Sequence, residues 1–119
     1  QFNRPLAAFQ LSQQKIADMA IATGNGMLLA AHLGKLKDQH LLRPEQVSVG
    51  KKNNVRMALE VARESRSMLG GSGITLEYPI IRHMNNLESV YTYEGTNEIH
   101  TLVVGQALTG IAAYADYKA

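Results

Sequence analysis

The sequence predicts an all-α domain folded as an antiparallel four-helix bundle. Apolar residues recur at three- and four-residue steps over long segments, as on one face of a helix. No segment keeps the strict apolar and polar alternation of a half-buried strand. Hydrophobic residues make up 45% of the 119 residues, aromatic residues only 6%, and cysteine is absent. We therefore expect one domain with a sizeable aliphatic core and no disulfide or thiolate metal site.

The first helix is expected from about Leu6 to about Asp38. Gly24 and Gly26 weaken it by roughly 1 kcal/mol each relative to Ala, so we expect a neighbouring helix to pack closely there. A repeating stripe predicts its buried face: Ile16, Met19, Ala20, Thr23, Met27, Ala30 and Gly34.

The second helix is expected from Pro44, a residue typical of a first helical turn, to Leu69. Gly70, Gly71, Ser72 and Gly73 end it and have two interpretations: a glycine cap with a turn, or open backbone against which a cofactor lies. The predicted buried face of this helix is Val47, Val55, Ala58, Leu59, Ala62, Ser65 and Leu69.

Two shorter helices complete the predicted bundle. One begins at Tyr78 and Pro79 and ends near Leu87, and the other runs from about Thr96 to about Tyr114. In the last helix Gly105 and Gly110 are expected to allow close helix contact, and these residues are expected to face the core: Ile99, Leu102, Val103, Ala107 and Ile111.

The most informative segment is residues 91–100, where Glu94 lies between aromatic residues and a helix start. A carboxylate in a half-apolar pocket is a candidate general base, because desolvation raises its pKa toward neutrality. Gly95 lets a ligand approach the backbone closely. The alternative is a plain helix start, with Thr96 as N-cap and Glu98 in the first turn.

Several classes of function are disfavoured. The net charge of +2 comes from scattered Lys and Arg, not from a basic block, so nucleic-acid binding is not expected. No apolar run approaches the roughly 18 residues of a membrane span, and we expect a soluble protein. The four His residues lack ligand spacing, so no metal is expected. His83 and His100 flank the Glu94 segment, as surface residues or as substrate contacts.

Three motifs carry a resemblance to one family. The opening QFNRPLAAFQLSQQKIADMA, the central LGGSGITLEYPIIRHMNN and the closing YEGTNEIHTLVVGQALTGIAA resemble, in this order, the C-terminal helical domain of acyl-CoA dehydrogenases. Residues 86–88, 100–102 and 109–111 are most similar to glutaryl-CoA dehydrogenases. The resemblance implies that residues 1–119 are this domain, a fragment without the N-terminal and middle domains. We expect the isolated fragment to be inactive and to bind FAD weakly.

The resemblance implies an oxidoreductase, a flavoprotein that uses FAD. Glu94 would remove the α-proton of an acyl-CoA thioester, and the Glu94 amide would help to hold the developing enolate charge. Glutaryl-CoA would be oxidised and decarboxylated to crotonyl-CoA, with electrons leaving to an electron-transfer flavoprotein. A homotetramer is implied, in the cytoplasm or, in a eukaryote, the mitochondrial matrix.

Residue roles follow from the same resemblance. Tyr93 and Gly95 would line the acyl thioester. The residues that would contact the cofactor are Phe2, Gln10, Gly70, Gly71, Thr96 and Glu98. Gly70 and Gly71 would do so largely from a neighbouring subunit. Asn3 stands where many relatives have Gly, and Ser67 where many have Gln on the flavin.

Two alternatives to this function stay open. The acyl group could differ, as in a short- or branched-chain acyl-CoA dehydrogenase or oxidase. The chain could also be a non-catalytic helical module whose glycines serve packing and self-association only.

Overall fold

The computed structural model describes residues 2–115, and within them it contains four α-helices and no strand, which confirms the all-α class. The elements in order are η1 (Leu6–Ala8), α1 (Gln10–Asp38), α2 (Pro44–Met68), η2 (Gly70–Ile74), α3 (Ile80–Thr92) and α4 (Asn97–Thr109).

Three of the predicted helix boundaries were wrong. α1 begins at Gln10 instead of near Leu6, because the extended backbone of Phe9 separates it from the short 3-10 helix Leu6–Ala8. α3 continues past Leu87 to Thr92, because the apolar spacing goes on through half-buried Val90 and Tyr91. α4 ends at Thr109 instead of near Tyr114, because Gly110 adopts a left-handed conformation and its amide donates to the Gln106 carbonyl at 2.8 Å.

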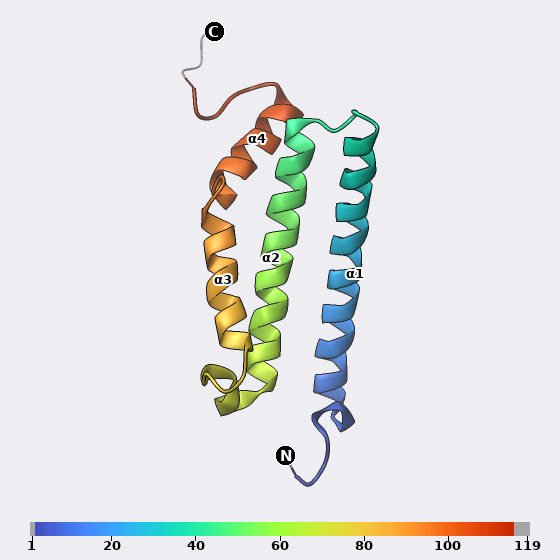
Figure 1. Ribbon diagram of the computed structural model, residues 1–119, viewed down its shortest axis with the longest axis vertical. Helices are drawn as coiled ribbons and strands as arrows, with labels where there is room; N and C mark the ends of the chain where they lie inside the picture. The colour runs from blue at the N-terminus through green and yellow to red at the C-terminus, as the bar shows by residue number, and fades with distance from the viewer. Residues whose placement is uncertain (1, 116–119) are drawn as a thin grey trace.

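The helices lie in one layer with α2 in the middle (Figure 1). α1 runs antiparallel along one side of α2, and α3 and α4 follow one another along the other side. The molecule measures 66 × 30 × 23 Å, so it is long and thin. Each outer helix therefore has one helical neighbour, α2, along most of its length.

α1 and α2 approach closely at two glycines. A Cβ atom on Gly26 would lie 2.5 Å from the Met57 side chain, and one on Gly50 would lie 2.3 Å from Leu33. Asn54 Nδ2 also donates to the Gly26 carbonyl at 2.9 Å. The close packing predicted at Gly26 is thus confirmed, whereas Gly24 has open space where its Cβ would be.

The predicted buried face of α1 was wrong. Of that stripe only Met19 is half-buried, while Ile16, Ala20, Thr23, Met27, Ala30 and Gly34 are exposed. α1 carries apolar residues around its whole circumference, so periodicity does not single out one face. The side that packs on α2 consists of Ser12, Lys15, Met19, Ala22, Gly26, Leu29, Leu33 and Leu36.

A sizeable core is not present among the described residues. Ala62, at 5% exposure, is the one buried hydrophobic residue among them, although most of the face predicted for α2 is half-buried. In α4, Leu102 and Val103 are half-buried but Ile99 and Ala107 are exposed, and a Cβ on Gly105 would meet nothing. Ile111, also predicted to face the core, lies beyond the end of α4 and is exposed. A single layer leaves two broad sides of each helix uncovered, and large apolar side chains such as Leu28, 71% exposed, lie there.

Candidate functional site

A tight turn carries Glu94 between α3 and α4. We call residues 93–96 the Glu94 turn. Glu94 has φ 55° and Gly95 has φ 93°, so both lie in the left-handed region. For a residue with a Cβ this conformation costs roughly 1–3 kcal/mol, and such strain gathers at functional sites. The turn thus interrupts the chain between α3 and α4 instead of continuing either helix.

The described residues do not shield the Glu94 carboxylate. Glu94 is exposed, and the neighbouring Tyr93 is 56% exposed. The half-apolar pocket expected from the sequence is therefore absent among residues 2–115, in which no helix of the single layer covers the outer side of the turn.

The start of α4 matches the helix-start interpretation. Thr96 is the N-cap, and its hydroxyl accepts a hydrogen bond from the Ile99 amide at 3.2 Å. Glu98 is exposed in the first turn. Its pKa is lowered mainly by a hydrogen bond from its own backbone amide and, to a smaller extent, by one from the Thr96 side chain. Both residues thus serve the helix end: Thr96, the last residue of the Glu94 turn, is half-buried, and Glu98 is exposed.

Side chains from α2 hold the inner side of the Glu94 turn. Lys51 Nζ donates to the Gly95 carbonyl at 2.7 Å and to the Tyr93 carbonyl. His100 Nδ1 lies 3.0 Å from the hydroxyl of Ser48, a buried residue. His100 is half-buried and lies under Gly95, so the surface interpretation of His100 was wrong, while its role as a substrate contact stays a prediction.

Sequence reasoning missed both Lys51 and Ser48. Each is a polar residue on a long amphipathic helix, where a polar residue usually faces solvent. Their partners lie more than 40 residues further along the chain. No local spacing therefore marks them as supports of the Glu94 turn.

The Gly70 corner ends α2 and leaves its backbone open. We use the name Gly70 corner for residues 70–73. Gly70 has φ 57°, and a Cβ on Gly70 or Gly71 would meet no atom within 4 Å. The corner borders a hollow of about 510 Å³ that Leu6 and Tyr78 also line. The predicted helix end is confirmed, and the open backbone offers room for a flat group.

The N-terminal candidates lie at the same end of the layer as the Gly70 corner (Figure 1). Phe2 is 83% exposed and meets the Phe9 ring edge-on at a centroid distance of 6.1 Å. Gln10 is exposed at the first position of α1. Asn3 has φ 56°, a conformation that Asn tolerates better than most residues, so it can replace the Gly of relatives here. Ser67 Oγ accepts from Lys15 at 3.4 Å.

The predicted site residues therefore form two separate groups in one chain. α3 separates the Gly70 corner from the Glu94 turn, and its 13 residues span roughly 20 Å at 1.5 Å per residue. Phe2, Gln10, Gly70 and Gly71 belong to the first group, and Tyr93, Glu94, Gly95, Thr96 and Glu98 to the second.

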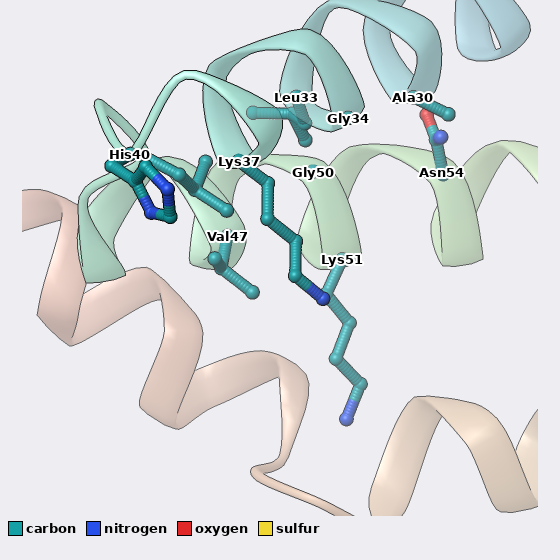
Figure 2. Close-up of a pocket in the computed structure, with 10 residues that line it drawn as sticks. Ala30, Leu33, Gly34, Lys37, His40, Val47, Gly50, Lys51 and Asn54 are labelled. Atoms are coloured by element: carbon teal, nitrogen blue, oxygen red, sulfur yellow. The ribbon is translucent and has the colours of Figure 1, made fainter.

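A groove not expected from the sequence lies between α1 and α2 near the loop that joins them. It has a volume of about 930 Å³, and Lys37, His40 and Lys51 are among its lining residues. Figure 2 shows the Lys51 side chain leaving α2 on the side away from α1, toward the segment between α3 and α4. Lys51 thus borders the groove while its ammonium group reaches the Glu94 turn.

Comparison with known proteins identifies the family. Residues 1–109 match the sequence model of the acyl-CoA dehydrogenase C-terminal domain. The chain therefore belongs to the acyl-CoA dehydrogenase family and corresponds to that domain.

Solved structures share the fold over nearly the whole chain. Glutaryl-CoA dehydrogenase from Mycobacterium smegmatis is 63% identical with a TM-score of 0.93, over 97% of this chain and 30% of that one. A second structure, of a glutaryl-CoA dehydrogenase from Mycobacterium smegmatis in complex with FADH2, is 60% identical, with a TM-score of 0.93 over 97% of this chain and 30% of that one. A structure described as the electron transferring flavoprotein of Acidaminococcus fermentans is 33% identical, with a TM-score of 0.87 over 92% of this chain and 29% of that chain.

Among curated sequences, a short-chain specific acyl-CoA dehydrogenase of Megasphaera elsdenii is 32% identical over 108 residues. That match covers 91% of this chain and 28% of the relative. The chain thus spans less than a third of the proteins it resembles. Within residues 2–115, no helix combines the length and the apolar character that crossing a membrane requires.

Proposed function

We propose that this chain supplies the general base and part of the flavin site of an FAD-dependent acyl-CoA dehydrogenase. The observation that carries the proposal is the Glu94 turn. A carboxylate stands out from a strained turn that α2 anchors, within a domain that matches this family. Backbone strain at a firmly held, exposed acid is expected at a reactive site, whereas a plain connection between two helices does not require it.

The reaction requires a base and a stabiliser of negative charge. The α-proton of an acyl-CoA thioester is weakly acidic, and a carboxylate placed against it becomes a stronger base once the substrate excludes water. Glu94 is accessible for this contact. No hydrogen bond to another described residue engages the Glu94 amide, which leaves that amide available to the thioester oxygen. Tyr93 and Gly95 would line the thioester.

The residues present fit an FAD cofactor. The Gly70 corner offers side-chain-free backbone at an open hollow, which suits a flat ring system. The N-terminus of α4, beside Thr96 and Glu98, suits phosphate groups, since its free amides and the helix dipole favour anions. Gln10 and Phe2 are accessible for further contacts. When bound, FAD supplies the acceptor for the hydride that leaves the β-carbon.

We further propose that the site is shared between copies of the chain. The Gly70 corner and the Glu94 turn lie too far apart along α3 to meet within one copy. The large apolar side chains exposed on α1, among them Ile21, Met27 and Leu28, favour burial against other parts of an assembly. A homotetramer, as the family resemblance implies, would bring the two groups of different copies together.

Glutaryl-CoA is the substrate we propose, with oxidative decarboxylation to crotonyl-CoA. Identity to the Mycobacterium smegmatis glutaryl-CoA dehydrogenase is about twice that to the short-chain relative, at 63% against 32%. We propose an electron-transfer flavoprotein as acceptor, and the neighbour described by that name supports a flavin electron-transfer context. The proposed location is the cytoplasm, or the mitochondrial matrix in a eukaryotic source, as for the human relative described as mitochondrial.

The test uses the full-length protein that carries this chain. Purified with FAD, it is assayed against glutaryl-CoA and butyryl-CoA, and we expect glutaryl-CoA to be preferred. Preference for butyryl-CoA would favour a short-chain dehydrogenase instead. Glu94→Gln should keep the flavin and lose roughly 10²–10⁴-fold in kcat, the usual contribution of a general base.

A matched control comes from Glu88, an exposed acid on α3 six residues earlier. Glu88→Gln should leave kcat unchanged. Full turnover in Glu94→Gln would exclude Glu94 as the base, and absence of any acyl-CoA oxidation by the unaltered holoenzyme would favour the non-catalytic module.

A further inference from the structure

We propose that Lys51 is a positioning residue for the reaction, which holds the Glu94 turn in the conformation that presents the carboxylate. The inference rests on the proposed role of Glu94 as general base. Lys51 lies on α2, more than 40 residues before the turn, and belongs to none of the motifs that carry the family resemblance.

The two hydrogen bonds of Lys51 enclose Glu94. The acceptors are the carbonyl oxygens of Tyr93 and Gly95, the residues on either side of it. One ammonium group therefore holds the peptide group that precedes Glu94 and the one between Gly95 and Thr96. With the chain held just before Glu94 and just after Gly95, the backbone path across these two residues is restricted, and so is the direction of the Glu94 Cα–Cβ bond.

The turn needs such a support because its backbone is unfavourable without one. Glu94 is an ordinary L-residue at φ 55°, and nothing in its side chain favours this region as it does for Asn or Gly. Two carbonyl oxygens directed at one place also repel each other unless a cation lies between them. The ammonium group lies 5.6 Å from the Tyr93 ring centroid, a further favourable contact.

The inner side of the turn is closed by packing. Ser48, one helical turn before Lys51, contacts the His100 ring, and that ring fills the place where a Cβ on Gly95 would be. The space enclosed by Lys51, Tyr91 and His100 measures only about 10 Å³, barely the room of one water. The turn cannot move inward, so the motion left to it is outward, and the Lys51 hydrogen bonds oppose that motion.

The test compares substitutions at Lys51 in the full-length holoenzyme with glutaryl-CoA. Lys51→Met keeps the length of the side chain without its charge. We expect a loss of about 10²-fold in kcat, the size of effect that a misplacement near 1 Å produces, with KM changed less than about threefold. Lys51→Arg keeps the charge in a different shape and should recover about tenfold of that loss. Lys35→Met, at an exposed position in the last turn of α1, is the control and should match the unaltered enzyme.

A fall in kcat at unchanged KM, flavin content and melting temperature supports positioning. A Lys51→Met enzyme within threefold of normal kcat overturns it, and so does a loss that merely follows the loss of flavin or folding. If Lys51→Met yields no folded holoenzyme, Lys51→Arg decides: a selective tenfold fall in kcat supports the inference, and a normal kcat overturns it.

The Glu94→Gln variant, measured alongside, separates two kinds of failure. An active Glu94→Gln enzyme removes the proposed function, and the role of Lys51 with it. An inactive Glu94→Gln enzyme beside a fully active Lys51→Met enzyme removes only the role of Lys51.

Discussion

The Gly70 corner and the Glu94 turn both follow the end of a helix, yet they are built in opposite ways. At the corner, glycines leave open backbone beside a hollow of about 510 Å³. At the turn, Lys51, Ser48 and His100 fill the inner side and fix the backbone. An open surface suits the binding of a large flat cofactor, whereas a rigid support suits a group that must meet one proton. The difference fits the roles that we propose, cofactor binding at the corner and proton removal at the turn.

Mixed assemblies give the sharpest test of that division. Glu94→Gln disables the turn, and Gly71→Glu places a bulky charge on the open corner, so each full-length variant alone should be inactive. If each site takes its turn from one copy and its corner from another, random pairing of the two co-expressed variants gives about a quarter of the sites an intact turn together with an intact corner. Those sites should be active. Activity is measured on purified mixed oligomers. No recovery in oligomers shown to contain both chains would place both regions of each site in a single copy.

Gly95→Ala probes the rigid side of the comparison. The new Cβ would lie 2.9 Å from His100 Nε2, at a φ of 93° that suits Gly alone. We expect unfolding to become easier by roughly 1–3 kcal/mol and kcat to fall, since the ring beneath the turn must shift. Gly105→Ala, with open space in mid-helix, is the control and should stabilise by up to about 1 kcal/mol. Thermal unfolding measures both, and an unchanged Gly95→Ala enzyme would show that the turn is not closely packed.

Two neighbouring substitutions separate folding from cofactor binding at the Gly70 corner. A Cβ on Gly73 would lie 2.2 Å from the Arg66 carbonyl oxygen, whereas one on Gly71 meets nothing. Gly73→Ala should therefore destabilise the fold by more than about 1 kcal/mol. Gly71→Ala should change stability by less than about 0.5 kcal/mol and weaken flavin retention on gel filtration. Normal flavin retention in a folded Gly71→Ala protein would argue against the corner as a flavin surface.

The smallest effect is expected at Glu98. Its pKa is lowered in the folded chain by the hydrogen bond from its own amide and then by Thr96, so its charged form is stabilised by folding. That stabilisation is present above the ordinary Glu pKa and is lost as the pH falls through the lowered value. Glu98→Gln should be less stable than the unaltered protein at neutral pH, and the difference should vanish in acid. Melting curves between about pH 3 and pH 7 test this, and a constant difference would rule out the carboxylate as the cause.

Local signals in the sequence predicted the helices and several of their starts and ends. Pro44, Gly70 and Thr96 each lie at the predicted end or start of a helix, because proline, glycine and a hydroxyl cap act on the backbone next to them. The motif containing Glu94 also indicated the family that the comparison with known proteins confirms. These features depend on neighbouring residues and can be read without the fold.

Features that depend on distant contacts were not predictable. The packed face of α1 could not be chosen, because Ile16 and Leu33 look alike in an apolar helix and only the position of α2 distinguishes them. The contacts of Lys51 and Ser48 depend on carbonyl partners in the Glu94 turn and on a ring partner in α4, more than 40 residues away. The sequence also predicted that the Glu94 carboxylate is shielded from water. The carboxylate is exposed in this chain, so its shielding depends on what covers the turn.

The most direct test of Glu94 as the general base is the exchange of the substrate's α-protons with solvent. The full-length holoenzyme is incubated with a saturated acyl-CoA in D₂O without an electron acceptor, and deuterium at the α-carbon is followed by mass spectrometry. We predict steady α-deuteration by the unaltered enzyme and by Glu88→Gln, and none above background by a flavin-loaded Glu94→Gln. Equal deuteration by Glu94→Gln would show that another group removes the proton and would contradict the role proposed for this turn.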